Sequence, residues 1–393
     1  LVNFATFVDA AGFMAHIVYV NHPLKTPASL LLLAAFSGVG AAPALAQSFD
    51  VIVPPPQFAP GSSVRGLSAD GTRATGAVSS PDGTSAFSFI WSRSEGLRVL
   101  QNEGLPQGFQ STGISGDGQV VTAGNRFVSN PLRWSSASGT QTLQIPSTYN
   151  RSFTTSLNHD GSIAVGYSQR FVQGPFPFTT ATLWGPDGSA TLLGTTRGGT
   201  SQATAISRDG STVVGVSDSG VEDAFVWTAA GGMQILSSRL GNATGHSQAY
   251  GVSNTGDYIV GQSNDLAVVW HNNTVTTLTL PDGTAYRTAA LSVSDDGRVI
   301  GGAAPISGPS SAQVAAVWTP ETKFIPLTDY LASFGVAVPT GVVPNYISYI
   351  SADGRTFAGQ TTDGYAFVAS IPSPGGMMVL VGPILLATRR RRA

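Results

Sequence analysis

Carboxylates are the residues of this chain best suited to chemistry. Two pairs are adjacent in the sequence, Glu222-Asp223 and Asp295-Asp296. Cleavage of a glycosidic bond by hydrolysis needs two carboxyl groups that both face the bond. Neighbouring residues of a strand point to opposite faces of the sheet, so neither pair can supply both groups to one site. We therefore expect these carboxylates to serve turns and solvated loops.

Other catalytic and metal-binding patterns are missing from the sequence. Beyond residue 46 the histidines are His159, His246 and His271, which lie far apart and lack the short spacings of metal ligands. Cysteine is absent, which excludes disulfides and thiolate chemistry. No G-x-S-x-G, H-E-x-x-H or Walker motif occurs. Calcium is a lesser alternative, because no D-x-D-x-D-G loop accompanies the Asp-Gly pairs. We expect no catalytic residue, no metal site and no cofactor.

The composition favours short strands joined by many turns. Of the 393 residues only 11% are charged, and 47 are glycine. The formal net charge is −2, and the charges are scattered except for four arginines at 389–392. Without a basic stripe, we expect no nucleic-acid partner.

One phrase recurs seven times and must position whatever chemistry exists. Its clearest copy is "ISRDGSTVVG" at 206–215, and its glycines fall at 71, 118, 161, 210, 256, 297 and 354. A period in the forties indicates a propeller, a solenoid or an array. Asp-Gly between apolar runs predicts a tight hairpin, because glycine adopts positive φ without steric cost.

Each unit continues with a second glycine, an apolar segment ending in Trp, and a strand ending in Leu. Four short strands in a repeated meander make one propeller blade. Trp suits a position between blades, since one side chain buries roughly 150–250 Å². We therefore interpret the repeated residues as structural: Asp70, Gly71, Asp117, Gly118, Asp160, Gly161, Asp209, Gly210, Gly256, Asp296, Gly297, Asp353, Gly354, Trp91, Trp134, Trp184, Trp227, Trp270 and Trp318.

The two ends of the repeat region complement each other. The seventh unit, in which Ala369 takes the Trp place, lacks a fourth strand, and Phe49 to Val53 reads as an orphan strand before the first unit. That strand could complete the seventh blade and remove exposed sheet edges. We predict an all-β protein, a seven-bladed propeller of four-stranded antiparallel blades over residues 47–371. A β-solenoid is the alternative.

The N-terminal segment, residues 1–46, has the order of a secretory signal peptide. Lys25 precedes an apolar run, and small residues lead to Ala44-Leu45-Ala46, so we expect cleavage before Gln47. The alternative is a short buried helix. Met14 is a plausible true start.

The C-terminal segment, residues 372–393, combines Pro372 and Pro374 with an apolar stretch over 377–387 and Arg389, Arg390, Arg391 and Arg392. Such arginines stay on the cytoplasmic side and halt export. The segment resembles the PEP-CTERM sorting signal, although Ser373 stands where Glu is usual. The resemblance implies a short hydrophobic membrane helix and an exosortase-like processing enzyme as partner. A plain tail anchor is the alternative.

The repeats resemble the HAF family of extracellular repeats over residues 48–371, on the S-x-D-G-x-x-V-V-G phrase followed by A-F-x-W. The closest copy of the family's His-Ala-Phe is Asp223-Ala224-Phe225. The resemblance implies an exported, propeller-like protein, with the export machinery as partner and a location at the bacterial cell surface, outer envelope or extracellular matrix.

For function we expect a non-catalytic binding or structural module that presents loops such as 167–180 and 303–314 to an extracellular polysaccharide or a surface protein. The alternative is an extracellular, glycosidase-like carbohydrate-active enzyme on the same scaffold. Acidic side chains converging at one mouth of the central channel would favour the enzyme. A purely structural spacer would bind nothing.

Overall fold

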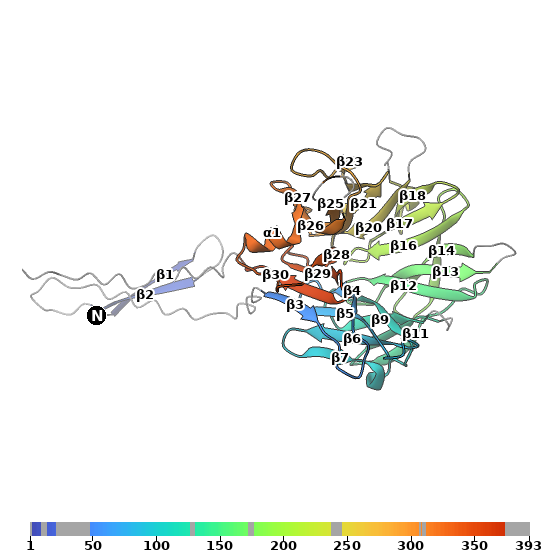
Figure 1. Cartoon of the computed structure of the whole chain (residues 1–393), viewed down its shortest axis with the longest axis horizontal. Helices are drawn as coiled ribbons and strands as arrows, with labels where there is room; N and C mark the ends of the chain where they lie inside the picture. Colours follow the sequence, from blue (N-terminus) through green and yellow to red (C-terminus); the bar gives the residue numbers. More distant parts are fainter. Residues whose placement is uncertain are drawn as a thin grey trace, which may run out of the picture. The chain divides into compact units, whose positions relative to one another are not determined.

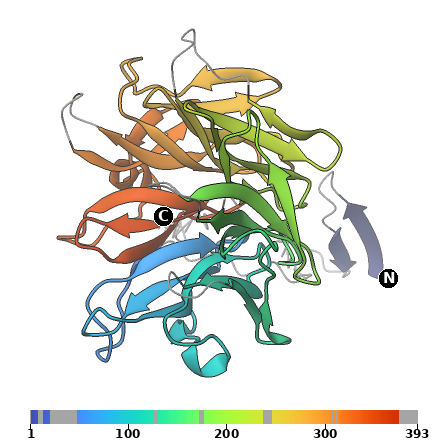
Figure 2. The ribbon, with the colours of Figure 1, turned by 90° about the vertical axis from the view of Figure 1, so that its right-hand side faces the viewer.

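The Asp-Gly hairpins organise the chain into seven four-stranded antiparallel sheets placed around a common axis (Figures 1 and 2). The computed structural model describes residues 2–8, 14–20, 48–125, 130–171, 177–236, 246–305, 308 and 312–373. The chain divides into two compact units, Leu1–Ala44 and Leu45–Ala393, and the second contains all seven sheets. The predicted seven-bladed propeller is thereby confirmed, and the solenoid alternative is wrong.

Six blades follow one another along the chain in order of their strands. Blade 1 contains β4 (Ser63–Leu67), β5 (Arg73–Ser79), β6 (Ala86–Ser92) and β7 (Gly96–Val99). Blade 2 contains β8 (Gln110–Ile114), β9 (Val120–Gly124), β10 (Leu132–Ser135) and β11 (Gly139–Thr142). Blade 3 contains β12 (Arg151–Leu157), β13 (Ala164–Arg170), β14 (Phe178–Trp184) and β15 (Ala190–Gly194). Blade 4 contains β16 (Thr200–Ile206), β17 (Thr212–Asp218), β18 (Glu222–Thr228) and β19 (Gly232–Ile235). Blade 5 contains β20 (Ser247–Val252), β21 (Ile259–Ser263), β22 (Leu266–His271) and β23 (Thr274–Thr277). Blade 6 contains β24 (Ala289–Val293), β25 (Ile300–Pro305), β26 (Gln313–Thr319) and β27 (Lys323–Pro326).

Blade 7 is assembled from both ends of the propeller. It contains β28 (Pro344–Ile350), β29 (Thr356–Thr361), β30 (Ala366–Ser370) and, from the N-terminal side, β3 (Ser48–Ile52). The β3 register runs from Ser48 opposite Ser370 to Ile52 opposite Ala366. This is the closure predicted from the missing fourth strand, since β3 covers the edge that β30 would otherwise expose.

The remaining elements are few. A 3₁₀ turn (Gln101–Glu103) follows blade 1, and helix α1 (Leu327–Ala332) follows blade 6. The N-terminal unit contains β1 (Val2–Val8) paired with β2 (Met14–Val20), while the rest of the predicted signal peptide up to residue 46 lies outside the described residues. The predicted membrane helix at 377–387 also lies outside them. Within the described ranges no helix is long and apolar enough to cross a membrane.

The hairpin phrase folds as a hydrogen-bonded turn. In blade 4, Asp209 Oδ1 accepts hydrogen bonds from Ser207 Oγ (2.5 Å) and from the Ser211 amide (3.0 Å), while Gly210 takes a φ of 77°. Burial opposes ionisation of this carboxyl, but the donated hydrogen bonds outweigh it and hold the pKa of Asp209 below its ordinary value. The repeated Asp and Gly thus close the turn.

The tryptophans fill the space between neighbouring blades. Trp134 of blade 2 is buried against Leu100 and Leu105, which follow blade 1. Its Nε1–H donates to the carbonyl of Glu103 at 2.6 Å. Trp184 of blade 3 is also fully buried and donates in the same way to Gln144 (2.7 Å). These two rings supply apolar area together with a satisfied polar atom, whereas Nε1 of Trp270 and Nε1 of Trp318 are buried without a hydrogen-bond partner among the described residues.

Every innermost strand contains a β-bulge at the same place. The residue skipped by the pairing is, in blade order, Arg65, Thr112, Thr155, Thr204, Tyr250, Leu291 and Ser348. In blade 4 the bulge is opposite Gly215, where a Cβ would fall 2.1 Å from the carbonyl oxygen of Gln202. The second repeated glycine therefore makes room for the bulge. Blade 2 differs, because Ala123 rather than Gly124 pairs with Ser111 beside the bulge.

Candidate functional site

The strand directions give the propeller two chemically different faces. The Asp-Gly turns join each innermost strand to the second, so they all lie on one face, here called the turn face. The innermost strands begin on the opposite face, together with the loops that join second and third strands. This is called the loop face. Because the seven innermost strands contact one another in a closed ring, a channel runs between the two faces.

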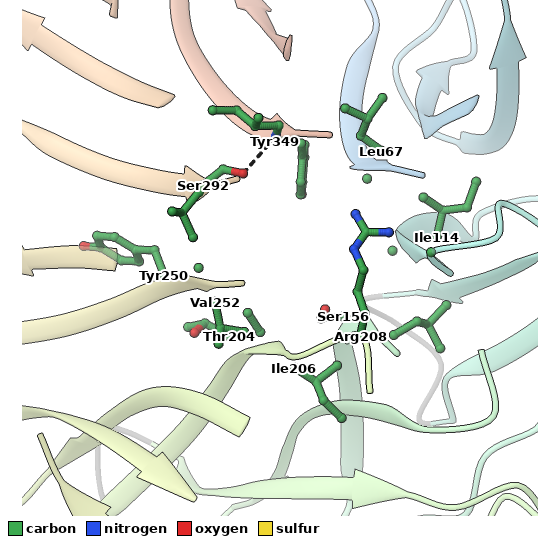
Figure 3. Close-up of a pocket in the computed structure, with 18 of the residues that line it drawn as sticks. Leu67, Ile114, Ser156, Thr204, Ile206, Arg208, Tyr250, Val252, Ser292 and Tyr349 are labelled. Atoms are coloured by element: carbon green, nitrogen blue, oxygen red, sulfur yellow. Dashed lines mark hydrogen bonds between the residues drawn. The ribbon is translucent and has the colours of Figure 1, made fainter. Parts of the chain in front are cut away.

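The channel contains a cavity of about 200 Å³ that reaches towards the turn face. An aliphatic side chain from each innermost strand lines it: Leu67, Ile114, Leu157, Ile206, Val252, Val293 and Ile350. Figure 3 shows several of these side chains around a central opening, with Arg208 extending into it. Each of these residues is the first residue of the repeated phrase, so the repeat itself builds the apolar collar.

At the turn face a ring of hydrogen bonds closes the channel wall. Such a bond crosses every junction between neighbouring blades. Its donor or its acceptor belongs to the third residue of the phrase, which is Arg208 in blade 4 and varies from blade to blade. In blade order the bonds are Ala69 N–H to Gly116 O (2.7 Å), Gly116 N–H to Asn158 O (3.3 Å), His159 N–H to Arg208 O (2.8 Å), Asp209 N–H to Asn254 O (3.3 Å), Asn254 N–H to Asp295 Oδ1 (3.3 Å), Asp295 N–H to Ala352 O (2.9 Å) and Ala352 N–H to Ala69 O (2.8 Å).

The side chains of this variable position form the turn-face mouth. Three are small, Ala69, Gly116 and Ala352, and four are polar, His159, Arg208, Asn254 and Asp295. We missed this ring in the sequence, although the signal was present: one position varies between charged and small residues inside a phrase that otherwise repeats.

Partial burial shifts the pKa values of the charged side chains at the turn-face mouth. Burial lowers the pKa of the Arg208 guanidinium, and the nearby Asp295 and Asp70 carboxylates oppose this shift. Burial likewise raises the pKa of Asp295, against the amide of Asn254 and the charge of Arg208. Each group is therefore held in a medium that disfavours its charge.

A groove of about 960 Å³ lies on the loop face over blades 1 to 3. It is lined by hydroxyl and small residues, by the rings of Phe153, Tyr167 and Tyr349, and by the exposed Arg65. Desolvation raises the pKa of Tyr349 to about 12, although Arg65 acts in the opposite direction. This phenol stays protonated at neutral pH and can donate a hydrogen bond.

A second loop-face pocket, here called the acidic pocket, lies at blades 4 and 5 and has a volume of about 390 Å³. It brings together Asp218 and Glu222 from the β17–β18 loop region, Asp265 from the β21–β22 turn, and His246 just before β20. Across the described ranges no group of three or more His, Asp or Glu side chains could hold a metal ion.

Glu222 is oriented by a chain of hydrogen bonds that leads to the channel. Gln248 Nε2 donates to Glu222 Oε2 at 2.6 Å, and the hydroxyl of Tyr250 donates to Gln248 Oε1, also at 2.6 Å. His246 Nδ1 lies 3.7 Å from the same Glu222 oxygen. Burial raises the pKa of Tyr250, and the negative charges of Glu222 and Asp265 add to that effect. Tyr250 is also a bulge residue that lines the channel cavity, so this chain of hydrogen bonds links a residue of the channel to the acidic pocket.

Asp265 enters the acidic pocket because of a strained turn. Asn264 and Asp265 join β21 to β22 with φ values of 51° and 62°. Asparagine and aspartate tolerate this left-handed region better than other non-glycine residues, and it gives the tight two-residue hairpin. The turn therefore explains how this carboxylate reaches a position beside Glu222, which is more than forty residues away in the sequence.

Glu222 and Asp223 lie on β18 and not in a loop, so the expectation of turns and solvated loops is wrong for this pair, whereas Asp295 and Asp296 lie in the turn after β24. Asp223 is buried, with its Oδ2 3.3 Å from Arg197 Nε, whereas Glu222 opens to the acidic pocket. Asp296 closes a turn with Ser294, while Asp295 faces the channel mouth.

The three histidines lie at separate places in the propeller. His159 belongs to the turn-face ring, His246 to the acidic pocket, and His271 stacks on Tyr258 with ring centroids 4.1 Å apart. Pro372 O accepts a hydrogen bond from Arg355 Nη1 (2.6 Å). Parts of the loops 167–180 and 303–314 lie outside the described residues, as do the predicted cleavage and sorting residues Ala44, Ala46, Gln47, Pro374 and Arg389–Arg392.

Comparison of the sequence with known protein families and with curated proteins finds no match. Several solved structures share the fold. An oligogalacturonate lyase from Vibrio parahaemolyticus has a TM-score of 0.54 and 11% identity over 95% of this chain and 97% of its own. An oligogalacturonate lyase in complex with manganese gives 0.53 and 13% over the same shares. An acylaminoacyl peptidase from Pyrococcus horikoshii gives 0.52 and 11%, over 79% of this chain and 51% of its own.

These findings correct the expected function. A non-catalytic binding or structural module was predicted because no catalytic motif is visible in the sequence. The similar structures include enzymes, and three carboxylates line one pocket of the loop face, although this pocket lies at blades 4 and 5 and not at the channel mouth named above. At these identities the likeness shows the propeller scaffold and nothing finer.

Proposed function

We propose that this protein is a carbohydrate-active enzyme that cleaves a glycosidic bond in the acidic pocket of its loop face. The observation that supports the proposal is the convergence of Asp218, Glu222 and Asp265 in one pocket of the loop face. Glycoside hydrolysis requires one carboxyl group to protonate the leaving oxygen and another to activate water or attack the sugar. Three carboxylates in one pocket meet that requirement.

Glu222 is the carboxylate best placed to act. Its Oε2 is held by Gln248, which Tyr250 orients in turn, so the chain Tyr250–Gln248–Glu222 fixes the position of the acceptor oxygen. Positioning of this kind places a reacting group where it can transfer a proton. Asp265 and Asp218 are the candidates for the second role, since both line the same pocket.

The loop-face groove would hold the rest of an oligosaccharide. Its hydroxyl residues can exchange hydrogen bonds with sugar hydroxyls, and the paired rings of Phe153 and Tyr167, with centroids 5.2 Å apart, offer apolar faces for sugar rings. Two of the similar structures are named for an oligogalacturonate, so this scaffold accommodates oligosaccharide-acting enzymes. An extended substrate is therefore part of the proposal.

The test is release of new reducing ends from a panel of neutral and acidic polysaccharides. We expect turnover of at least one, and we expect Glu222→Gln to reduce the rate by about 10²–10⁴-fold. The matched control is Glu321→Gln, which changes an exposed carboxylate paired with Arg298. Absorbance of an unsaturated product separates elimination from hydrolysis.

Two results would overturn the proposal. One is the absence of new reducing ends from every polysaccharide in the panel. The other is a folded Glu222→Gln variant that is as active as the Glu321→Gln control. Asp265→Asn provides a second variant, because asparagine keeps the left-handed turn at this position.

We also propose that the enzyme acts outside the cytoplasm, after removal of residues 1–46 and processing of the tail at 372–393 by an exosortase-like enzyme. Two features support this. β3 begins at Ser48, so cleavage before Gln47 leaves the closing strand of blade 7 intact, and β30 ends at Ser370. The intact mass of protein from its producing cells tests the proposal, since a mass that retains the four arginines would contradict tail removal and indicate a plain anchor.

A further inference from the structure

The channel cavity contains a cation with one nitrogen that has no hydrogen-bond partner among the described residues. Nη1 of Arg208 is buried and has no hydrogen-bond partner among the described residues. Figure 3 shows the guanidinium of Arg208 extending into the opening between the innermost strands. A buried donor without an acceptor destabilises the folded state, and a charged donor does so more strongly, so such a group normally has a partner.

The carboxylates near Arg208 do not supply that partner. Asp295 is engaged with blade 5, where its two oxygens accept hydrogen bonds from the main-chain and side-chain nitrogens of Asn254. Asp70 serves its own turn, where it accepts from Ser68 (2.6 Å) and from the Thr72 amide (3.0 Å). Both carboxylates favour the charged form of Arg208 through space, but neither accepts a hydrogen bond from its Nη1.

The wall of the cavity offers further donors and one further cation. The amide of Ile350 donates to Ser292 Oγ at 2.8 Å, which leaves the hydroxyl hydrogen of Ser292 free to donate into the cavity (Figure 3). Arg65 lines the same cavity from the side of the loop-face groove. Among the residues that line it, two arginines therefore stand against the single carboxylate of Asp295.

The local sequence makes room for the side chains of Arg208 and His159. A Cβ on Gly116 would fall 2.7 Å from Arg208 Nη1 and 2.5 Å from His159 Nδ1, so blade 2 can carry only glycine here without displacing them. The cavity has a volume of about 200 Å³ and is surrounded by the aliphatic collar, so it is small for a polymer. It suits a molecule of a few heavy atoms.

We propose that the channel cavity binds a small organic carboxylate, held through its carboxylate group by the guanidinium of Arg208. A guanidinium and a carboxylate match in planar, two-point geometry, and such charge-assisted pairs are among the strongest hydrogen-bonded contacts. Ser292 donates to the same anion, and the positive balance of the lining attracts it. This site is separate from the acidic pocket and does not depend on the proposed glycosidic cleavage.

Isothermal titration calorimetry of the full chain with malonate tests the proposal, at constant ionic strength and with the neutral isostere malonamide as the matched ligand. Malonate is expected to bind with saturation, and malonamide at least about tenfold more weakly. Arg208→Gln should abolish malonate binding. The control Arg298→Gln, at an exposed arginine paired with Glu321, should bind malonate as the unchanged chain does.

Arg208→Lys keeps the proposal testable should Arg208→Gln fail to fold. Lysine preserves the charge but cannot make the two-point contact, so malonate should bind about tenfold more weakly than to the unchanged chain. Equal affinity for malonate and malonamide would overturn the proposal. So would unchanged malonate binding in a folded Arg208→Gln or Arg208→Lys variant.

Discussion

The two faces of the propeller are built from the same innermost strands and yet differ sharply. On the turn face, each blade contributes the same hairpin and one link to a continuous ring of hydrogen bonds. On the loop face, blades 1 to 3 form a groove rich in hydroxyls, whereas blades 4 and 5 form the acidic pocket. The residues that repeat thus build the turn face, and residues that differ between blades form the groove and the acidic pocket of the loop face.

The β-bulge of each innermost strand lies between the two faces. Replacement of the glycine opposite the bulge is expected to have the largest effect. Gly215→Ala would push a Cβ to 2.1 Å from the Gln202 carbonyl, so blade 4 must lose its bulge or shift its strands. We expect a loss of more than about 2 kcal/mol in the free energy of unfolding, measured by denaturant titration.

The control for this change is Gly124→Ala in blade 2, where the nearest atom to an added Cβ is 3.8 Å away. It should change the free energy of unfolding by no more than about 0.5 kcal/mol. Equal losses in the two variants would show that the bulge does not depend on the repeated glycine, since blade 2 already has Ala123 in the equivalent place.

The loop-face end of the channel should respond to alkaline pH through Tyr349. Its folded pKa of about 12 lies above the ordinary 10.0, so the folded state keeps the phenol proton after the unfolded chain has lost it. The associated stability is complete below pH 10 and is lost as the pH rises towards about 12. Tyr349→Phe should lose less stability than the unchanged chain over that window, as measured by thermal unfolding from pH 8 to 11. Parallel curves would contradict this assignment.

The smallest effect concerns the one turn-face hairpin that departs from the others. Blade 5 has Thr255 where the other six blades have Asp, and Thr255 Oγ1 donates to Asp257 Oδ2 at 2.6 Å. The hydroxyl and the carboxylate have therefore exchanged places. Thr255→Asp combined with Asp257→Ser restores the common turn and should stabilise the protein by about 0.5–1 kcal/mol in denaturant titration. Thr255→Asp alone places two carboxylates together and should not stabilise it.

Much of the fold could be predicted from local patterns. An Asp-Gly pair between apolar runs specifies a hairpin wherever it occurs, and the Trp segments mark a further strand in each unit. Closure by Phe49–Val53 followed from counting strands, and the structure pairs Phe49 with Ala369 as that count requires. The sequence did not predict helix α1, nor that Ala123 takes the place beside the bulge that glycine has in the other blades, because neither feature recurs from unit to unit.

The candidate sites were far less accessible from the sequence. Glu222 and Asp265 belong to different blades, and no spacing rule connects loops whose lengths vary from blade to blade. Arg208 occupies a position that is otherwise small or polar, and only the direction of the strand shows that this position faces the axis. A variable residue inside an invariant phrase was the available signal.

The sequence by itself determined the number of blades, the hairpin turns and the way the ring closes, because each depends on contacts between residues near one another in a unit or on a simple count of strands. The tertiary structure alone decided which side chains meet. One bulge in every innermost strand shifts the pairing by a residue and so changes the face on which the following side chains lie. Closing seven such strands into a ring then brings Arg208 beside Gly116, and Glu222 beside Asp265.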